Sequence, residues 1–127
     1  MPYPTDYKYT KEHEWIKVDG KNATIGITHH AQEALGDIVF VDLPKIGSEI
    51  HSGKAFGSVE SVKAVSDLFA PVSGTVTALN GDLATAPEKI NKDAHSAWMI
   101  KIALKDPAEL NSLLSPDDYE KFVAEEG

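Results

Sequence analysis

The stretch Gly57-Ser-Val-Glu-Ser-Val-Lys-Ala-Val-Ser-Asp67 contains a single lysine, Lys63, among short apolar and small residues, with carboxylates nearby at Glu60 and Asp67. A solvated charged surface would carry several charges at close spacing, and this stretch does not. A lysine in this setting is suited to recognition by a modifying enzyme and to carrying a covalently attached group. The plain alternative is a solubilising surface residue, and this stretch alone leaves both open.

Strand-forming segments on both sides of Lys63, residues 55–59 and 68–70, predict a hairpin with the lysine near its tip. The intervening Val62-Lys63-Ala64 lacks the Gly or Asn of a tight two-residue turn, so turn chemistry alone does not establish the hairpin. A swinging-arm carrier requires a rigid hairpin that exposes one amine among small neighbours. An amide between that amine and a carboxylic cofactor would remove the positive charge. Roughly ten bonds of about 1.2–1.3 Å each would then give a reach of about 12–14 Å.

The N-terminal part of the chain predicts a hairpin followed by a short helix. In residues 14–27, the segments 15–18 and 23–27 flank the turn cluster Asp19-Gly-Lys-Asn22, which is typical of a hairpin. Thr28 is a candidate N-cap for a helix that runs through residue 35, and Gly36 provides a left-handed stop.

The middle of the chain is typical of a small, mainly β barrel or sandwich. Residues 37–43 predict a strand that ends at Pro44, and Pro or Gly recurs at short, regular intervals after it. Residues 98–104 alternate and predict a half-buried strand. One face of that strand would hold Trp98, Ile100, Ile102 and Leu104.

The C-terminal tail predicts two short helices packed on the sheet. Asp106-Pro107-x-Glu109 combines an N-cap, a proline at the first helical position and a glutamate at the third. Ser115-Pro116 repeats the start signal, and an apolar stripe of Tyr119, Phe122 and Val123 follows it. We therefore expect one domain, residues 1–127, with an N-terminal extension at 1–8 and C-terminal helices at 106–127.

Composition excludes several classes of function. The chain has 127 residues, 42% hydrophobic and 25% charged, as in ordinary globular domains. It has no cysteine, which excludes disulfides, zinc–thiolate sites, iron–sulfur clusters and a cysteine nucleophile. The net charge of −8 argues against nucleic acid or an anionic membrane as a partner. The N-terminus does not resemble a secretory signal, so a cytoplasmic bacterial protein is expected, with a processed mitochondrial form left open.

No self-contained catalytic or metal-binding constellation is evident. His29 and His30 are adjacent, so on a helix they diverge by about 100° and would not chelate one ion together; surface or capping roles are expected for the histidines. The acidic residues show no pairing that predicts glycosidase chemistry. There is neither a Gly-x-Ser-x-Gly elbow nor a phosphate-binding glycine loop.

The chain resembles the H-protein family of the glycine cleavage system, over nearly its whole length from about residue 9. The matching motifs are Tyr9-Thr-Lys-Glu-His-Glu-Trp15, Ile25-Gly-Ile-Thr28, Ala31-Gln-Glu-Ala-Leu-Gly-Asp-Ile-Val-Phe-Val41, Leu43-Pro44, Phe56-Gly57, Glu60-Ser-Val-Lys-Ala-Val-Ser-Asp67 and Pro71-Val-Ser-Gly74. The resemblance implies a lipoyl/biotinyl-type barrel-sandwich hybrid, with a short helix after the N-terminal hairpin and C-terminal helices. It also implies lipoic acid amide-linked to Lys63.

The resemblance further implies a non-catalytic carrier with several partners. A pyridoxal-phosphate glycine decarboxylase (P protein) would load an aminomethyl group onto the arm and release CO₂. A tetrahydrofolate-dependent aminomethyltransferase (T protein) would take it and release ammonia, and a flavin dihydrolipoyl dehydrogenase (L protein) would reoxidise the dithiol. A lipoate ligase or octanoyltransferase would attach the cofactor. The lack of cysteine agrees with this, because the cofactor brings both sulfurs.

Three carboxylates have expected roles on the same basis. Glu14 and Asp67 match the family's cleft and are expected near the loaded arm, where they would hold the aminomethyl nitrogen and slow its hydrolysis. Glu60 is expected to contribute to recognition. For Glu14 and Asp67, the alternative is recognition or plain surface charge.

One stretch departs from the family pattern, and it keeps other functions open. The family has a Pro-Tyr-Gly-x-Gly-like segment before its tryptophan, whereas residues 91–98 read Asn-Lys-Asp-Ala-His-Ser-Ala-Trp, one residue shorter. An H-protein-like paralogue that relays lipoyl groups, or serves another complex, is therefore the main alternative. A biotinyl carrier is disfavoured because Val62 and Ala64, rather than methionines, flank the lysine. A free-standing enzyme has almost nothing in its favour.

Overall fold

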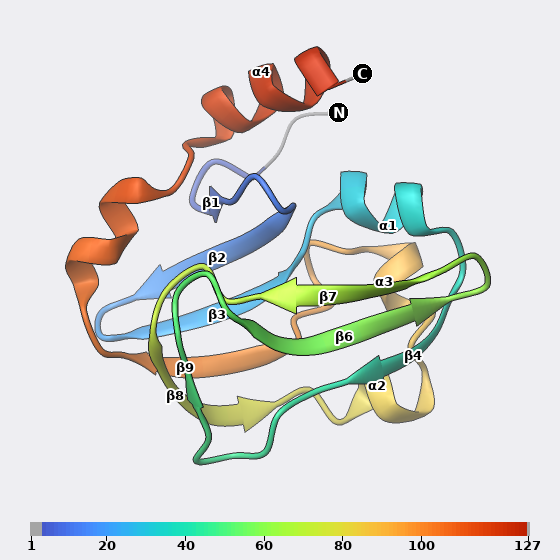
Figure 1. Ribbon diagram of the computed structural model, residues 1–127, viewed down its shortest axis with the longest axis horizontal. Helices are drawn as coiled ribbons and strands as arrows, with labels where there is room; N and C mark the ends of the chain where they lie inside the picture. The colour runs from blue at the N-terminus through green and yellow to red at the C-terminus, as the bar shows by residue number, and fades with distance from the viewer. Residues whose placement is uncertain (1–3, 127) are drawn as a thin grey trace.

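The structure, a computed structural model, describes residues 4–126, which form two antiparallel sheets with helices around them (Figure 1). The larger sheet has the order β1-β2-β3-β9-β8-β5 and the smaller one β4-β6-β7. The strands are β1 Lys8–Tyr9, β2 Glu14–Asp19, β3 Asn22–Ile27, β4 Ile38–Asp42, β5 Glu49–Ile50, β6 Ala55–Ser61, β7 Val65–Phe69, β8 Gly74–Leu79 and β9 Ile100–Leu104. The helices are α1 His29–Leu35, α2 Asp82–Thr85, α3 Lys89–Lys92, the 3₁₀ helix η1 Pro107–Ser112 and α4 Pro116–Glu126.

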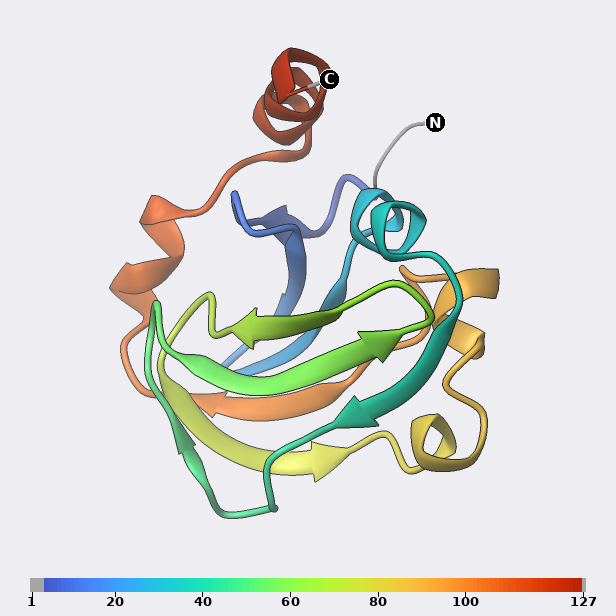
Figure 2. The ribbon, with the colours of Figure 1, turned by 45° about the vertical axis from the view of Figure 1, so that its right-hand side comes forward.

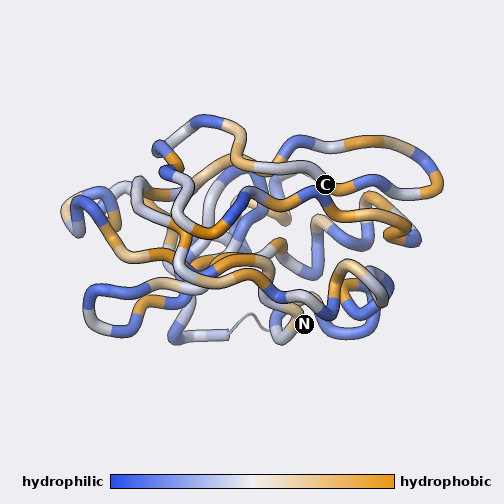
Figure 3. Tube along the Cα trace, turned by 90° about the horizontal axis from the view of Figure 1, so that it is seen from below, coloured by the Kyte–Doolittle hydropathy of each residue, from blue (hydrophilic) through white to orange (hydrophobic). Residues whose placement is uncertain are grey.

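The hydrophobic core lies between the two sheets. Its buried side chains come from both of them: Ile16, Ile25 and Ile102 from the larger sheet, and Val59 and Leu68 from the smaller one. Along the strands, hydrophobic and hydrophilic residues follow one another closely (Figure 3). This pattern is expected of antiparallel sheets that bury one face and leave the other to solvent. The mainly β, two-layered fold predicted from the sequence is confirmed.

The predicted N-terminal hairpin is present. β2 and β3 pair along their whole length, and the turn contains Gly20 with a φ of 62°. Opposite Trp15, a Cβ on Gly26 would lie 2.6 Å from the indole ring, so the indole occupies the space that a side chain would need. The indole Nε1 donates to the carbonyl of Ala94 at 3.0 Å. Trp15 therefore ties this hairpin to the segment before β9.

The predicted lysine hairpin is also present, formed by β6 and β7, and it projects at the right-hand end of the molecule in Figure 1. β6 is the central strand of the smaller sheet, with β4 on its other side. A Cβ at Gly57 would lie 2.3 Å from the carbonyl oxygen of Asp42. Because that neighbour is backbone, only glycine permits β4 and β6 to approach this closely.

The short helix forms where the sequence predicts it. Thr28 caps α1 by accepting from the backbone N–H of Ala31 at 3.2 Å, and Gly36 ends the helix with a φ of 79°. The single-turn helices α2 and α3 were not predicted. Neither has a side-chain cap, and Pro87 interrupts the segment between them, so no apolar period marks them in the sequence.

The prediction of a strand over residues 98–104 is wrong at its start, because β9 begins at Ile100. The carbonyl of Trp98 accepts from the Asn80 side-chain amide at 2.8 Å instead of joining the ladder. The Trp98 ring packs against the aromatic cluster of Tyr9, Trp15 and Tyr119 rather than the main core. Alternation of hydrophobicity cannot distinguish the aromatic cluster from the main core, so the prediction began the strand too early.

The first predicted tail helix forms as the 3₁₀ helix η1. Asp106 caps it by accepting from the Ala108 N–H at 3.1 Å. Glu109 does not close a capping box. Its carboxylate accepts from the backbone N–H of Ser73 at 2.7 Å and from the Ser73 hydroxyl at 3.0 Å, so it fastens the tail to the loop before β8.

The second tail helix, α4, lies outside the two sheets and beside β1 (Figures 1 and 2). Ser115 caps it by accepting from the Asp118 N–H at 3.2 Å. The predicted stripe of Tyr119, Phe122 and Val123 packs into the aromatic cluster, where Tyr119 is fully buried. The predicted N-terminal extension includes residues 1–3 and the predicted helical tail includes residue 127, and these positions lie outside the described residues.

Candidate functional site

The turn that presents Lys63 is closed by the side chain of Ser61. The backbone N–H of Ser61 donates to the carbonyl of Ala64 at 2.8 Å. The Ser61 hydroxyl accepts from the N–H of Lys63 at 3.2 Å and of Ala64 at 3.1 Å, and it donates to the Ala64 carbonyl at 3.2 Å. One hydroxyl thereby uses both its acceptor sites and its proton. These bonds replace the Gly or Asn that the turn lacks.

Lys63 rests on the turn between α1 and β4. The N–H of Val62 donates to the carbonyl of Asp37 at 3.0 Å, which holds the hairpin against that turn. A Cβ on Gly36 would lie 3.4 Å from Cε and 3.8 Å from Cδ of Lys63, so the aliphatic stem lies across the glycine. Gly36 therefore serves twice: its φ of 79° ends the helix, and its Cα surface supports the aliphatic stem of the lysine.

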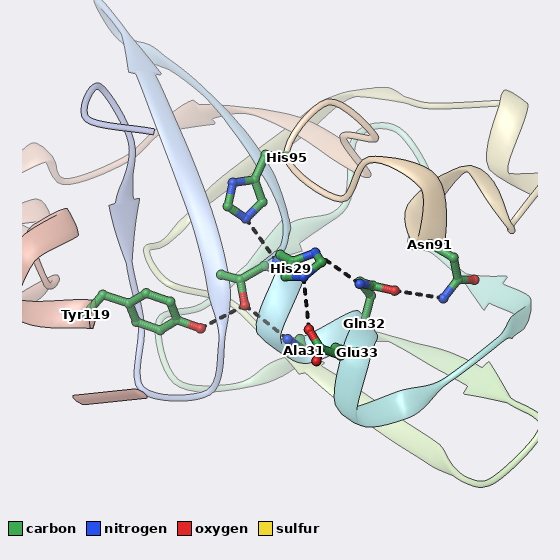
Figure 4. A network of polar contacts seen from close by, with 8 residues as sticks. His29, Ala31, Gln32, Glu33, Asn91, His95 and Tyr119 are labelled. Carbon is green, nitrogen blue, oxygen red and sulfur yellow. Dashed lines mark hydrogen bonds and ion pairs between the residues drawn. The ribbon is translucent and has the colours of Figure 1, made fainter. Parts of the chain in front are cut away.

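Asn91, from α3, braces the turn on which Lys63 rests. Its amide oxygen accepts from the N–H of Ile38 at 2.8 Å, and its amide nitrogen donates to the carbonyl of Gly36 at 2.8 Å. The same nitrogen donates to Oε1 of Gln32 at 3.0 Å, a contact visible in Figure 4. One side chain thus connects α3, α1 and the first residue of β4.

The start of α1 is a second junction, drawn in Figure 4. The hydroxyl of Thr28, fully buried, lies 2.8 Å from the hydroxyl of Tyr119 in α4. The N–H of His29 donates to Nε2 of His95 at 3.0 Å. This acceptor role requires an unprotonated Nε2, and burial lowers the pKa of His95, which favours that state. The tail helix and the loop before β9 are both tied to α1 in this way.

A cleft of about 250 Å³ opens between the N-terminal segment, the far end of β7 and the tail. One of its walls is fastened by two backbone bonds between Tyr9 and Leu114, at 2.9 and 2.8 Å. The other lining residues include Thr10, Lys11, Glu14, Ser52, Phe69 and Pro71.

Glu14 is the buried carboxyl group of this cleft, with 2% of its surface exposed. It accepts from the Thr10 hydroxyl at 2.7 Å and from the backbone N–H of Phe69 at 3.3 Å. Burial is the main cause that raises its pKa to about 7; the two hydrogen bonds oppose the rise, and the charge of Glu12 adds to it. A cation entering the cleft would favour the ionised form of Glu14.

The structure separates the other two predicted carboxylates from Glu14. Glu60 pairs with Val65 and lies exposed beside the lysine turn. Asp67 pairs with Ser58 and is also exposed. It is not one of the described residues that line the cleft. Phe69, two residues farther along β7, is the residue that reaches Glu14. Asp67 therefore lies between the lysine turn and the cleft.

Sequence reasoning did not find Ser61 as the residue that closes the turn, nor Asn91 as a brace. Ser61 is buried at the end of an otherwise ordinary strand, and a serine there has no distinctive pattern. Asn91 acts on Ile38 across 53 positions of the chain, and no local signal reports such a contact.

The departing segment before Trp98 is well connected. Besides the bonds from Trp15 and His29, the carbonyl of His95 accepts from the Tyr7 hydroxyl at 2.8 Å. In the part of the chain that the structure describes, no group of three or more His, Asp or Glu side chains is arranged to hold a metal ion. Across residues 4–126, no helix has the length and apolar composition to cross a membrane.

We predict that Ser61→Ala loosens the lysine turn while the fold persists. Two N–H groups lose their acceptor, and the expected loss in unfolding free energy is about 1–2 kcal/mol. Amide exchange of Lys63 and Ala64 should accelerate at least about tenfold. The control is Ser58→Ala, in the same strand. Equal exchange at the turn in both variants would show that the hydroxyl does not close it.

We predict that Glu14 makes the protein less stable as the pH rises. Because the folded pKa of about 7 lies above the ordinary 4.5, the stabilising contribution of the neutral group is full below pH 4.5 and is lost as the pH approaches 7. The loss in unfolding free energy is about 3 kcal/mol. In denaturant titrations between pH 4.5 and 8, Glu14→Gln should remove this part of the pH dependence of the unfolding free energy. Parallel curves for the two proteins would contradict the raised pKa.

The comparisons with known proteins agree with this architecture. The family model described as Glycine cleavage H-protein matches residues 7–126. The Glycine cleavage system H protein of Koribacter versatilis is 71% identical over 126 residues, covering 99% of this chain and 98% of the relative. That of Acidobacterium capsulatum is 67% identical, with the same coverage.

A solved structure supports the same conclusion at the level of the fold. The crystal structure of a glycine cleavage system H protein from Mycobacterium marinum superposes with a TM-score of 0.82 at 35% identity, covering 98% of this chain and 99% of that one. The two-sheet architecture with its protruding lysine hairpin is thus the barrel-sandwich arrangement expected of lipoyl-type domains. The chain belongs to the glycine cleavage H-protein family.

Proposed function

We propose that this protein is the lipoyl carrier of a glycine cleavage system, with lipoate amide-linked to Lys63. In this role it passes the aminomethyl group of glycine from the glycine decarboxylase to the aminomethyltransferase, and dihydrolipoyl dehydrogenase reoxidises it. It is a non-catalytic component, active in the bacterial cytoplasm. The observation that carries the proposal is the rigid, Ser61-closed turn that exposes a single lysine amine at the end of the smaller sheet.

The residues around Lys63 fit a carboxylic cofactor held through an amide. The side chain is exposed, its neighbours Val62 and Ala64 are small, and its stem lies on a glycine. In attachment, the amine nitrogen bonds to an activated carboxyl carbon, the bond from that carbon to its leaving group breaks, and the nitrogen loses a proton. The amide is neutral, so the modified hairpin keeps its acidic residues and loses its cation. The attached dithiolane would supply the redox-active sulfurs that this chain lacks.

The length of β7 fits an arm that folds back toward the cleft. Phe69 lies four positions after Val65 on this extended strand, a distance of about 13 Å. An arm of roughly ten bonds that starts at Lys63, two residues before Val65, reaches about 12–14 Å, so when folded back it extends along most of β7 toward the end at which the cleft with Glu14 opens. Glu14 would then hold a cationic aminomethyl nitrogen in its ionised form, and burial would keep water from that nitrogen. Asp67, on the same strand, is proposed as a further carboxylate along the route.

The alternative role, a lipoyl relay or a carrier for another complex, rested on the altered segment before Trp98. That segment is held by Trp15, Tyr7 and the start of α1, so its different sequence does not leave it unattached. Its first residue, Asn91, braces the turn on which Lys63 rests, so the altered sequence still supports the presentation of the lysine. The glycine cleavage role is therefore the one we favour.

We predict that co-expression with a lipoate ligase, or an octanoyltransferase with its sulfur-inserting partner, adds the mass of one lipoyl group. Peptide mapping should place it on Lys63. Lys63→Arg is the matched control: it keeps the charge and the fold, but it should gain no mass and should lose carrier activity. A lipoyl group on another lysine, or none in the presence of an active ligase, would defeat the assignment.

We also predict that the lipoylated protein acquires label when it is mixed with glycine decarboxylase and glycine labelled at the methylene carbon. Glu14→Gln should still acquire the label but lose it to hydrolysis several times faster, because the buried carboxylate no longer holds the nitrogen. Intact-protein mass spectrometry over time measures both quantities. A lipoylated wild-type protein that takes up no label would favour the relay role.

A further inference from the structure

The large exposed hydrophobic side chains of the described residues are unevenly distributed. Four of them, at 50–68% exposure, surround the lysine turn: Val39, Phe40, Val62 and Val65. The fifth, Ile46, is 65% exposed and lies in the loop after β4. We call the first four the turn patch. Scattered exposed apolar residues are ordinary, but a cluster around one functional side chain is typical of an interaction surface.

A β-bulge produces half of the turn patch. Ile38 pairs with Ser61 and Phe40 pairs with Glu60, so Val39 is an extra residue in β4. In a regular strand, consecutive residues alternate between the two faces, and one of Val39 and Phe40 would join the core. The bulge breaks this alternation and leaves both exposed. Such bulges commonly serve to direct side chains at functional sites.

Sheet register places acidic groups among these apolar ones. Phe40, Glu60 and Val65 lie in one row across β4, β6 and β7. The next row on the same face is Asp42, Ser58 and Asp67, since these residues are two positions farther along each strand. Directly opposed residues have Cβ atoms about 4.5–5.5 Å apart, so the two rows form a continuous surface.

The position of the turn patch selects among the proposed partners. An enzyme that forms the amide must bring its reacting carbon to Nζ of Lys63, and it therefore contacts the residues immediately around that amine. An enzyme that acts on the far end of the arm works about 12–14 Å away and has no need of these contacts. The acidic residues and the net charge of −8 fit a partner with basic groups around an apolar pocket.

We propose that the outer face of β4-β6-β7, with Phe40 and Val65 at its centre and Asp42 and Glu60 beside them, is the docking surface for the enzyme that attaches the cofactor. This proposal rests on the proposed function, because it takes Lys63 as the attachment site. The partner presents an apolar pocket bordered by Arg or Lys. Apolar contact provides affinity, and the carboxylates accelerate association.

The test measures steady-state lipoylation of the unmodified protein by a lipoate ligase with ATP and lipoate. Phe40→Ser is compared with Ile46→Ser, which removes an equally exposed apolar side chain outside the turn patch. We expect Phe40→Ser to raise KM about tenfold or more with kcat within about twofold, and Ile46→Ser to match the wild type. Thermal unfolding of both variants checks that they remain folded. A direct binding titration of each variant in a Lys63→Arg background measures docking without reaction.

A second pair tests the charges. Asp42→Asn should lower kcat/KM at low salt and reduce its salt dependence, whereas Glu49→Gln, an exposed carboxylate on β5, should change neither. Equal kinetics for Phe40→Ser and Ile46→Ser, or a loss confined to kcat, would overturn the docking proposal while lipoylation of the wild type on Lys63 still supported the carrier function. Normal lipoylation of Phe40→Ser with weaker loading by glycine decarboxylase would assign the surface to that enzyme and overturn the proposal as well.

Discussion

The side-chain amide of Asn91 is the contact on which the geometry of the lysine site depends. It binds both the last carbonyl of the α1 cap, at Gly36, and the first N–H of β4, at Ile38. The turn held between these two points supports Val62 through a backbone bond and Lys63 through the bare face of Gly36. A protruding hairpin is normally free to move relative to the body of a domain. Here the hairpin is anchored at its tip as well as at its base, so the position of the amine is defined by the whole fold.

Local chemistry explains what the sequence predicted well. The β2–β3 hairpin has its own turn cluster, α1 has Thr28 and Gly36 at its ends, and α4 has a clear apolar stripe. In each case the signal and the structure lie within a few residues of each other. The resemblance to a family then implied the barrel-sandwich architecture of the whole chain. The fold could therefore be predicted in outline from the sequence.

The rest depends on contacts between distant parts of the chain. Glu109 lies at the third position of its helix and binds Ser73 in a neighbouring loop, which offers two donors at once. Trp98 was expected on a strand and belongs to the aromatic cluster. Ser61, Asn91 and the buried state of Glu14 could not be predicted, since each follows from which segments meet in space. The separation of Asp67 from Glu14 has the same origin: β7 meets Glu14 at Phe69, two residues beyond Asp67.

The Ser61 hydroxyl also bears on how this kind of hairpin can change during evolution. In most tight turns the shape is encoded by the residues at the tip, so their identity is constrained. Here the shape is encoded one position before the tip, by a side chain that is buried beneath it. The side chains on either side of Lys63 are consequently not needed to form the turn, which uses only the backbone groups of these residues. Substitutions at positions 62 and 64 can alter which enzyme recognises the lysine without altering how the lysine is presented.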